Sequence, residues 1–123
     1  GLFDLTTSPR ADRAIGELIT TPLLDGLSQP LTGFENHRGA TTLGADAAPL
    51  GTVRHGVGNG AGQPVEGVVQ GSVLGTYMHG PLLARNPELA DYLLAQALGT
   101  ELAPLDLPEV EQLRRERLAV GRR

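Results

Sequence analysis

The chain has 123 residues, of which 40% are hydrophobic but only 3% aromatic, and it contains neither tryptophan nor cysteine. Ten basic and fourteen acidic residues give a formal charge of -4, which argues against a general nucleic-acid surface. The lack of cysteine excludes a disulfide framework, and neither a signal peptide nor a long apolar span is visible. We therefore expect a cytoplasmic protein without a membrane span.

The chain opens directly on Gly1-Leu2-Phe3-Asp4-Leu5, which resembles the middle of a strand and lacks an initiator methionine. We therefore expect a fragment or a processed product whose beginning is missing. Strands are predicted over residues 14–24, ending near Pro22, over 31–36 and over 51–57. Small and polar residues from His37 to Pro49 predict a loop.

Glycines dominate residues 58–62, and they predict a turn. The two apolar runs that follow, 65–69 and 72–78, predict two further strands. These segments complete a sheet-rich block.

A helix is predicted to begin at Asn86-Pro87-Glu88, because asparagine caps helices, proline fits the first turn and a carboxylate favours the amino end. The helix is expected to run to about Leu98 and to end at Gly99. Its apolar positions follow helical spacing and should pack on the sheet: Leu89, Ala90, Leu93, Leu94 and Ala97.

A proline-containing linker and a charged helix over 109–120 complete the chain. We therefore divide the sequence into a main unit, residues 1–98, and a C-terminal segment, residues 99–123. The basic residues cluster in that segment, where a solvated helix end is expected: Arg114, Arg115, Arg117, Arg122 and Arg123.

His79 follows an apolar run of small residues and precedes Gly80-Pro81. This places an imidazole at the end of a predicted buried strand, where open α/β sheets present reactive groups. Histidine suits proton transfer because both of its protonation states are accessible near neutral pH. A structural role is the alternative, since no Gly-x-Ser-x-Gly elbow supplies a nucleophile and a thiol would have to lie outside this sequence.

Two further patterns have simpler explanations than a ligand site. The histidines His37, His55 and His79 match no compact ligand spacing, so we predict no metal site. The glycine-rich stretch 56–60 lacks the lysine and the following helix of a phosphate-binding loop, which favours a hairpin turn.

Polar residues near two strands are candidate binding groups. Glu35, Asn36 and His37 follow one another at the end of a predicted strand, where they could bind a polar substrate or fix a loop. Arg13 could clamp a carboxylate or form an ordinary surface ion pair. The residues alone leave these alternatives open.

Four segments together resemble one enzyme family. They are Gly33-Phe34-Glu35-Asn36-His37, Glu66-Gly67-Val68, the run from Gly75-Thr76-Tyr77-Met78-His79-Gly80-Pro81 to Leu83, and the run from Asn86-Pro87-Glu88 to Leu94. They are similar to the C-terminal half of the CobB/CobQ-type class I glutamine amidotransferases, and most of all to the GatD type, a subunit of lipid II isoglutaminyl synthase. The resemblance covers about residues 1–98, and the Gly-Thr-Tyr-x-His-Gly-Pro run joined to Asn-Pro-Glu is its most specific part.

The resemblance implies the C-terminal part of a flavodoxin-like α/β domain, a sheet-rich block followed by a packing helix. In this family a cysteine attacks the side-chain amide of glutamine without a cofactor. His79 matches the catalytic histidine, which moves protons as ammonia leaves and as water releases glutamate. Arg13 matches the arginine that holds glutamine, and Glu35, Asn36 and His37 are expected to line or organise the pocket.

The resemblance also implies a partner, an ATP-dependent Mur-ligase-like subunit of the MurT type. That subunit uses the ammonia to amidate D-glutamate of the lipid II stem peptide in peptidoglycan synthesis. Pro81 stands where the usual class I triad has its glutamate, so the resemblance implies that an acidic residue of the partner fills this role. The family cysteine lies upstream of the segment that begins at Gly1, and we expect a missing N-terminal half to supply it, with the fragment alone inactive.

Two rival functions remain open at this point. A cobyrinic or cobyric acid synthase amidotransferase domain would share the chemistry but amidate a corrinoid. A binding module that kept the fold without its nucleophile would have no catalytic function.

Overall fold

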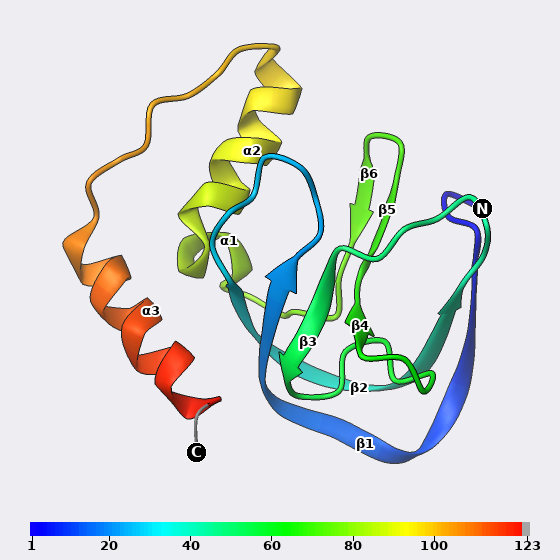
Figure 1. Ribbon diagram of the computed structural model, residues 1–123. Coiled ribbons are helices and arrows are strands. Elements are labelled where there is room, and N and C mark those ends of the chain that lie inside the picture. Colours follow the sequence, from blue (N-terminus) through cyan, green and yellow to red (C-terminus); the bar gives the residue numbers. More distant parts are fainter. Residues whose placement is uncertain (122–123) are drawn as a thin grey trace.

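The computed structural model describes residues 1–121 (Figure 1). Its elements in chain order are β1 (Leu5–Pro22), β2 (Leu31–Leu43), β3 (Gly51–His55), β4 (Val65–Glu66), β5 (Val68–Gln70), β6 (Val73–Gly75), α1 (Leu82–Arg85), α2 (Pro87–Leu98) and α3 (Pro108–Val120). Strands precede helices along the chain, so the predicted sheet-rich block followed by a packing helix is confirmed. Among the helices of residues 1–121, none has the length and apolarity needed to cross a membrane.

The main sheet has the strand order β2-β1-β3-β4, and its neighbouring strands are antiparallel. Strands β1 and β2 form its long ribbon, with pairs from Leu5↔Leu43 to Thr20↔Leu31. The predicted loop over 37–49 is therefore wrong in its first part, because β2 continues to Leu43. The amino-terminal half of β1 supplies backbone partners for this stretch, and that long-range pairing overrides its small and polar composition. Residues 1–4 precede β1 instead of forming its middle.

A second, two-stranded sheet consists of β5 and β6. The predicted strand over 65–69 divides at Gly67, whose φ of 72° is natural for glycine and unfavourable for other residues. Asn59 holds this turn, because its side chain donates to the Gly67 carbonyl oxygen and accepts from the Gly67 N–H. Strand β6 ends at Gly75, so His79 does not lie at a strand tip as predicted but in the segment that follows.

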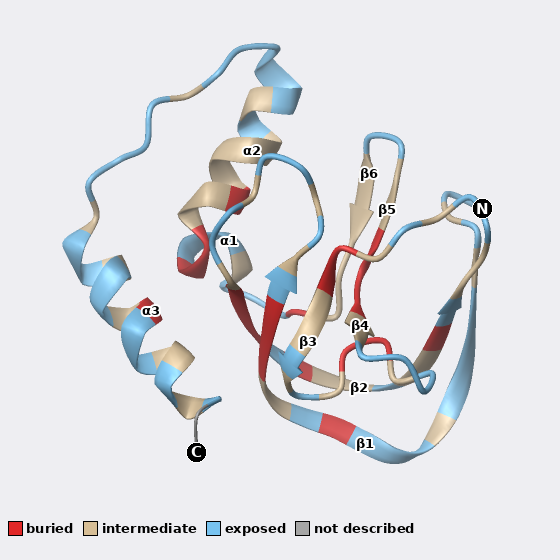
Figure 2. Cartoon of the chain, viewed as in Figure 1, coloured by how far each residue is buried: buried red, intermediate tan, exposed pale blue. Residues whose placement is uncertain are grey.

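The core lies between the sheets and the start of α2. Its buried cluster consists of Leu18, Leu31, Leu50, Met78 and Leu89. Leu89 gives α2 its predicted packing face, whereas Leu94 is 51% exposed and points away from the core. Figure 2 shows the same gradient, with buried positions at the start of α2 and exposed ones at its far end.

Helix α1 was not predicted, and it changes the role of Asn86. The Asn86 side chain makes no capping hydrogen bond to α2, contrary to the prediction, and is only 1% exposed. It accepts a hydrogen bond from the Thr32 N–H at 2.9 Å and donates to the Thr32 carbonyl oxygen at 2.8 Å. Asn86 thus completes the backbone hydrogen bonding of β2 and fixes the α1–α2 junction to the sheet.

Helix α3 is attached to the rest of the chain through arginine side chains. Arg114, predicted to be solvated, is 4% exposed and donates to the carbonyl oxygens of Arg85 and Pro30 at 2.7 and 2.8 Å. Arg117 is half-buried and forms an ion pair with Glu17 of β1 at 3.5 Å. Arg115 is exposed as expected, whereas Arg122 and Arg123 lie outside the described residues.

Candidate functional site

His79 is joined to the outer edge of β2. Its backbone N–H donates to the Phe34 carbonyl oxygen at 2.8 Å, and the two residues form an isolated antiparallel bridge. The preceding Met78 lies against Gly33, where an added Cβ would stand 2.6 Å from the Met78 Cβ. Glycine at position 33 therefore lets the segment that carries His79 approach the strand closely.

The side chain of His79 is on the solvent side of this contact. Residues opposite each other in an antiparallel bridge point to the same face, and Phe34 is exposed. Met78, one residue earlier, is buried in the core, and His79 is exposed. The imidazole is thus accessible to a substrate or to another polypeptide.

Arg13 and Asn36 lie on the same outer face. The alternation of a strand places Asn36 on the side of Phe34, two residues along β2, which is about 7 Å. The Arg13 Nε donates to the Asn36 Oδ1 at 2.5 Å. Arg13 lies in the irregular stretch of β1 where the pairing register shifts between Pro9 and Ala14. We call His79, Asn36 and Arg13, together with Phe34, the outer β2 face.

Glu35 and His37 point the other way, so the predicted Glu35-Asn36-His37 cluster is divided between two faces of β2. Glu35 is 2% exposed and accepts hydrogen bonds from the N–H groups of Val57 and Gly58 at 2.6 and 2.9 Å. The His37 Nε2 lies 3.3 Å from Glu35, and the His37 ring stacks on Tyr77 with 3.7 Å between centroids. Glu35 therefore fixes the loop at Val57 and Gly58, which is one of the two roles proposed for the cluster.

Glu66 is a buried residue whose role the sequence did not reveal. It is 0% exposed, and its Oε1 accepts hydrogen bonds from the Thr76 hydroxyl at 2.6 Å and the Tyr77 N–H at 2.7 Å. A carboxylate inside the apolar run around Val65 and Val68 was the available signal, since such a group requires polar partners when buried. Glu66 thus belongs to the support of the segment that carries His79.

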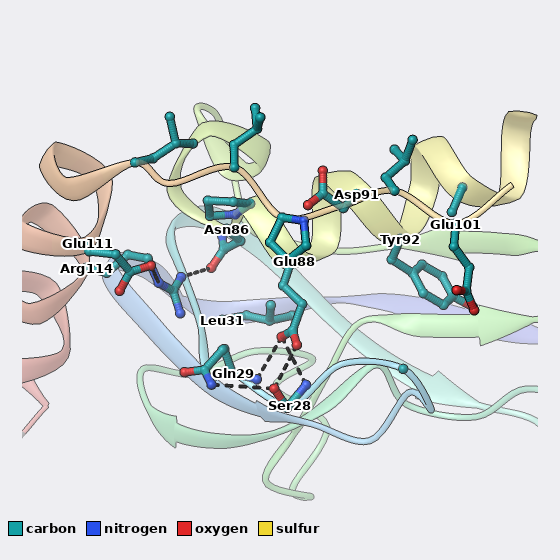
Figure 3. Close-up of a pocket in the computed structure, with 17 residues that line it drawn as sticks. Ser28, Gln29, Leu31, Asn86, Glu88, Asp91, Tyr92, Glu101, Glu111 and Arg114 are labelled. Atoms are coloured by element: carbon teal, nitrogen blue, oxygen red, sulfur yellow. Dashed lines mark hydrogen bonds and ion pairs between the residues drawn. The ribbon is translucent and has the colours of Figure 1, made fainter.

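Two cavities lie away from the outer β2 face. The larger, about 530 Å³, lies between the β1–β2 connection, α2, and the linker leading to α3 (Figure 3). In it the Glu88 carboxylate accepts hydrogen bonds from Ser28 and Gln29. The smaller cavity, about 190 Å³, adjoins Thr41 and Tyr77. Neither of these two cavities is lined by His79 or Arg13.

The three histidines are distributed over separate elements. His37 lies in β2, His55 in β3, and His79 after β6. Within residues 1–121, no group of three His, Cys, Asp or Glu side chains is arranged to hold a metal ion.

Comparison with known proteins places these residues in a family. The CobB/CobQ-like glutamine amidotransferase domain matches residues 1–87. The chain is 35% identical over 111 residues to the GatD subunit of lipid II isoglutaminyl synthase from Staphylococcus aureus, covering 90% of this chain and 44% of that protein. It is 42% identical over 88 residues to the GatD subunit from Streptococcus pneumoniae, covering 71% and 34%.

A cobyric acid synthase is also similar. The protein from Sphingopyxis alaskensis is 34% identical over 96 residues, which cover 78% of this chain and 18% of that synthase. The chain thus spans less than half the length of each of these three relatives. The family match includes the whole sheet-rich block and the segment of His79, and the chain therefore belongs to the CobB/CobQ-like glutamine amidotransferase family.

Proposed function

We propose that this chain is the histidine-bearing part of a glutaminase subunit that releases ammonia for the amidation of lipid II. The observation that carries the proposal is the outer β2 face, where the exposed His79 and the Arg13–Asn36 pair lie on the same side of the strand. The two GatD relatives support lipid II as the acceptor, because the Staphylococcus protein is similar over 90% of this chain.

In this proposal a cysteine thiolate, on a segment outside these 123 residues, attacks the side-chain amide carbon of glutamine. His79 gives a proton to the departing nitrogen, so ammonia leaves and a thioester forms. His79 then takes a proton from water, whose oxygen attacks the thioester carbon and releases glutamate and the thiol. The reaction consumes one water and needs no cofactor.

Arg13 is proposed to hold the α-carboxylate of glutamine. A guanidinium offers several N–H donors in a fixed plane, which suits a carboxylate. The hydrogen bond from the Arg13 Nε to Asn36 uses one donor and restricts the side chain, leaving its terminal nitrogens for a ligand. Asn36 therefore has a positioning role in this proposal.

The ammonia is proposed to pass directly to an ATP-dependent Mur-ligase-like partner, which amidates D-glutamate in the lipid II stem peptide. Direct transfer protects ammonia from protonation by water, which would remove its nucleophilicity. Because Pro81 follows His79 at two residues, the group that orients the imidazole is proposed to come from the partner as an acidic side chain.

A reconstituted assay of the full-length protein with its ligase partner tests the acceptor. With glutamine labelled in its amide with ¹⁵N, we expect the label in lipid II and none in a cobyrinic acid derivative offered under the same conditions. Label transfer to the corrinoid instead would assign the chain to the cobyric acid synthase type. No ammonia release with either acceptor would favour a non-catalytic binding module.

A further inference from the structure

The segment that carries His79 is supported by one buried carboxyl group, that of Glu66. Thr76 and Tyr77 follow β6 directly, and both donate hydrogen bonds to the Glu66 Oε1, at 2.6 and 2.7 Å. The Thr76 hydroxyl in turn accepts a hydrogen bond from the Met78 N–H at 3.0 Å. A single oxygen atom thus orders three consecutive residues immediately before His79.

The backbone around Glu66 is itself fixed by hydrogen bonds to other segments. Its carbonyl oxygen accepts a hydrogen bond from the Leu50 N–H at 3.0 Å, and it pairs with Gly51 across the β3–β4 ladder. The backbone N–H and carbonyl oxygen of the next residue, Gly67, are both hydrogen-bonded to the side-chain amide of Asn59. The carboxyl group therefore extends from a well-fixed backbone and can fix the position of the segment from Thr76 to Met78.

We infer that Glu66 is the positioning residue of His79, which it holds in place through the Thr76–Met78 backbone. The inference rests on the proposed function for the role of His79, although the contacts themselves do not depend on that role. At the other end of the segment, the His79 N–H is bound to the Phe34 carbonyl oxygen. The imidazole is thus carried between two fixed points, Glu66 in the interior and Phe34 at the edge of β2.

The pKa of the Glu66 carboxyl group is raised in this position. Burial raises the pKa of Glu66, the hydrogen bonds from Thr76 and Tyr77 lower it, and the nearby Glu35 raises it further, so the net change is upward. Glu35 faces it from β2 together with its partner His37. The Glu66 Oε2 has no hydrogen-bond partner among the described residues, an arrangement that disfavours a negative charge there.

The Glu66→Gln variant should therefore preserve the support, because a glutamine keeps an acceptor oxygen without a charge. The Glu66→Ala variant removes the acceptor. Amide hydrogen exchange of Tyr77 and Met78 measures the difference and requires no enzymatic activity. We expect exchange at these two amides to quicken by about tenfold or more in Glu66→Ala and to stay within about threefold of the parent protein in Glu66→Gln.

The Thr76→Val variant is the matched test if Glu66→Ala fails to fold, because it keeps the shape of the side chain and removes only the hydroxyl. It should quicken exchange at Met78 while leaving the amides of β3 protected. In the full-length enzyme, Glu66→Ala and Thr76→Val should lower kcat more than they change KM, and Glu66→Gln should restore kcat.

The inference would be overturned if the Tyr77 and Met78 amides exchanged as fast in Glu66→Gln as in Glu66→Ala. It would also be overturned if Thr76→Val lost protection uniformly throughout β3 to β6. If the parent enzyme releases no ammonia, the proposed function fails, yet the exchange measurement still decides whether Glu66 fixes the segment.

Discussion

At the scale of single residues, the strand alternation of β2 separates the side chains proposed to bind substrate from those that support the structure. Asn36 faces outward with Arg13, whereas Glu35 faces inward and binds the N–H groups of Val57 and Gly58. The sequence placed these side chains in one cluster, because it showed their adjacency but not the continuation of the strand through them. The outward pair is therefore where a change should affect glutamine binding.

Replacing Arg13 with alanine should raise the KM for glutamine in the full-length enzyme by about 10- to 100-fold, with a smaller change in kcat. The reason is that a charge-assisted hydrogen bond to the substrate carboxylate is worth about 1.5–3 kcal/mol. Steady-state ammonia release at varied glutamine concentration gives both constants. Arg54→Ala, an exposed arginine on β3, is the matched control and should leave them unchanged. An unaltered KM in Arg13→Ala would assign Arg13 to a surface ion pair or hydrogen bond only.

At the scale of elements, local signals predicted the helices better than the strands. Pro87 and Glu88 mark the start of α2 correctly, and Gly99 ends it in the left-handed conformation. The charged helix predicted over 109–120 is α3, which begins one residue earlier, at Pro108. The length of β2 and the edge position of His79 depend on partners distant in the sequence, β1 and Phe34, which local composition does not encode. For the same reason the buried environments of Asn86 and Arg114 were missed, since both side chains bind backbone groups of other elements.

Arg114 should be the residue that secures α3 to the sheet. Its guanidinium donates to the Pro30 and Arg85 carbonyl oxygens and to the Asn86 Oδ1, so Arg114→Met would remove the side-chain donor of two carbonyl oxygens and leave the Asn86 Oδ1 with only its hydrogen bond from the Thr32 N–H. We expect this change to lower the free energy of unfolding by about 2–4 kcal/mol. Urea denaturation measures the loss. The neighbouring Arg115→Met, at an exposed position, should change stability by less than about 0.5 kcal/mol. Similar stability of the two variants would show that α3 is held by its apolar contacts instead.

At the scale of the whole molecule, the outer β2 face is the surface on which the account depends. Besides His79, this face carries Phe34, which is 37% exposed. Ile15 of β1, which pairs with Asn36, is 64% exposed. Within residues 1–121, β2 backbone groups are hydrogen-bonded to the His79 N–H at Phe34, to the Asn59 carbonyl oxygen at Thr41 and to the Asn86 side chain at Thr32. Exposed apolar side chains on an edge strand are features that another polypeptide segment can cover. The proposed function assigns this place to the segment with the nucleophilic cysteine.

The family and the candidate histidine could be predicted from short motifs, because the run from Gly75 to Pro81 and Asn86-Pro87-Glu88 resemble motifs of the family that residues 1–87 match. The support of His79 could not, since Glu66 reaches Thr76 and Tyr77 only through the folding of β4 against the segment after β6. A glutamate within an apolar run can be recognised as unusual in the sequence, but the groups that bind it are known only from the structure.

The rate of ammonia release from glutamine by the full-length protein carrying His79→Ala tests the central claim most directly. The account predicts that kcat falls by about 10²- to 10⁴-fold, the usual contribution of a general acid–base residue, while the protein remains folded. His55→Ala, which replaces a histidine on β3, should retain the parent rate. If His79→Ala also retains the parent rate, His79 does not move protons in this reaction, and the assignment of the outer β2 face as the catalytic surface is contradicted.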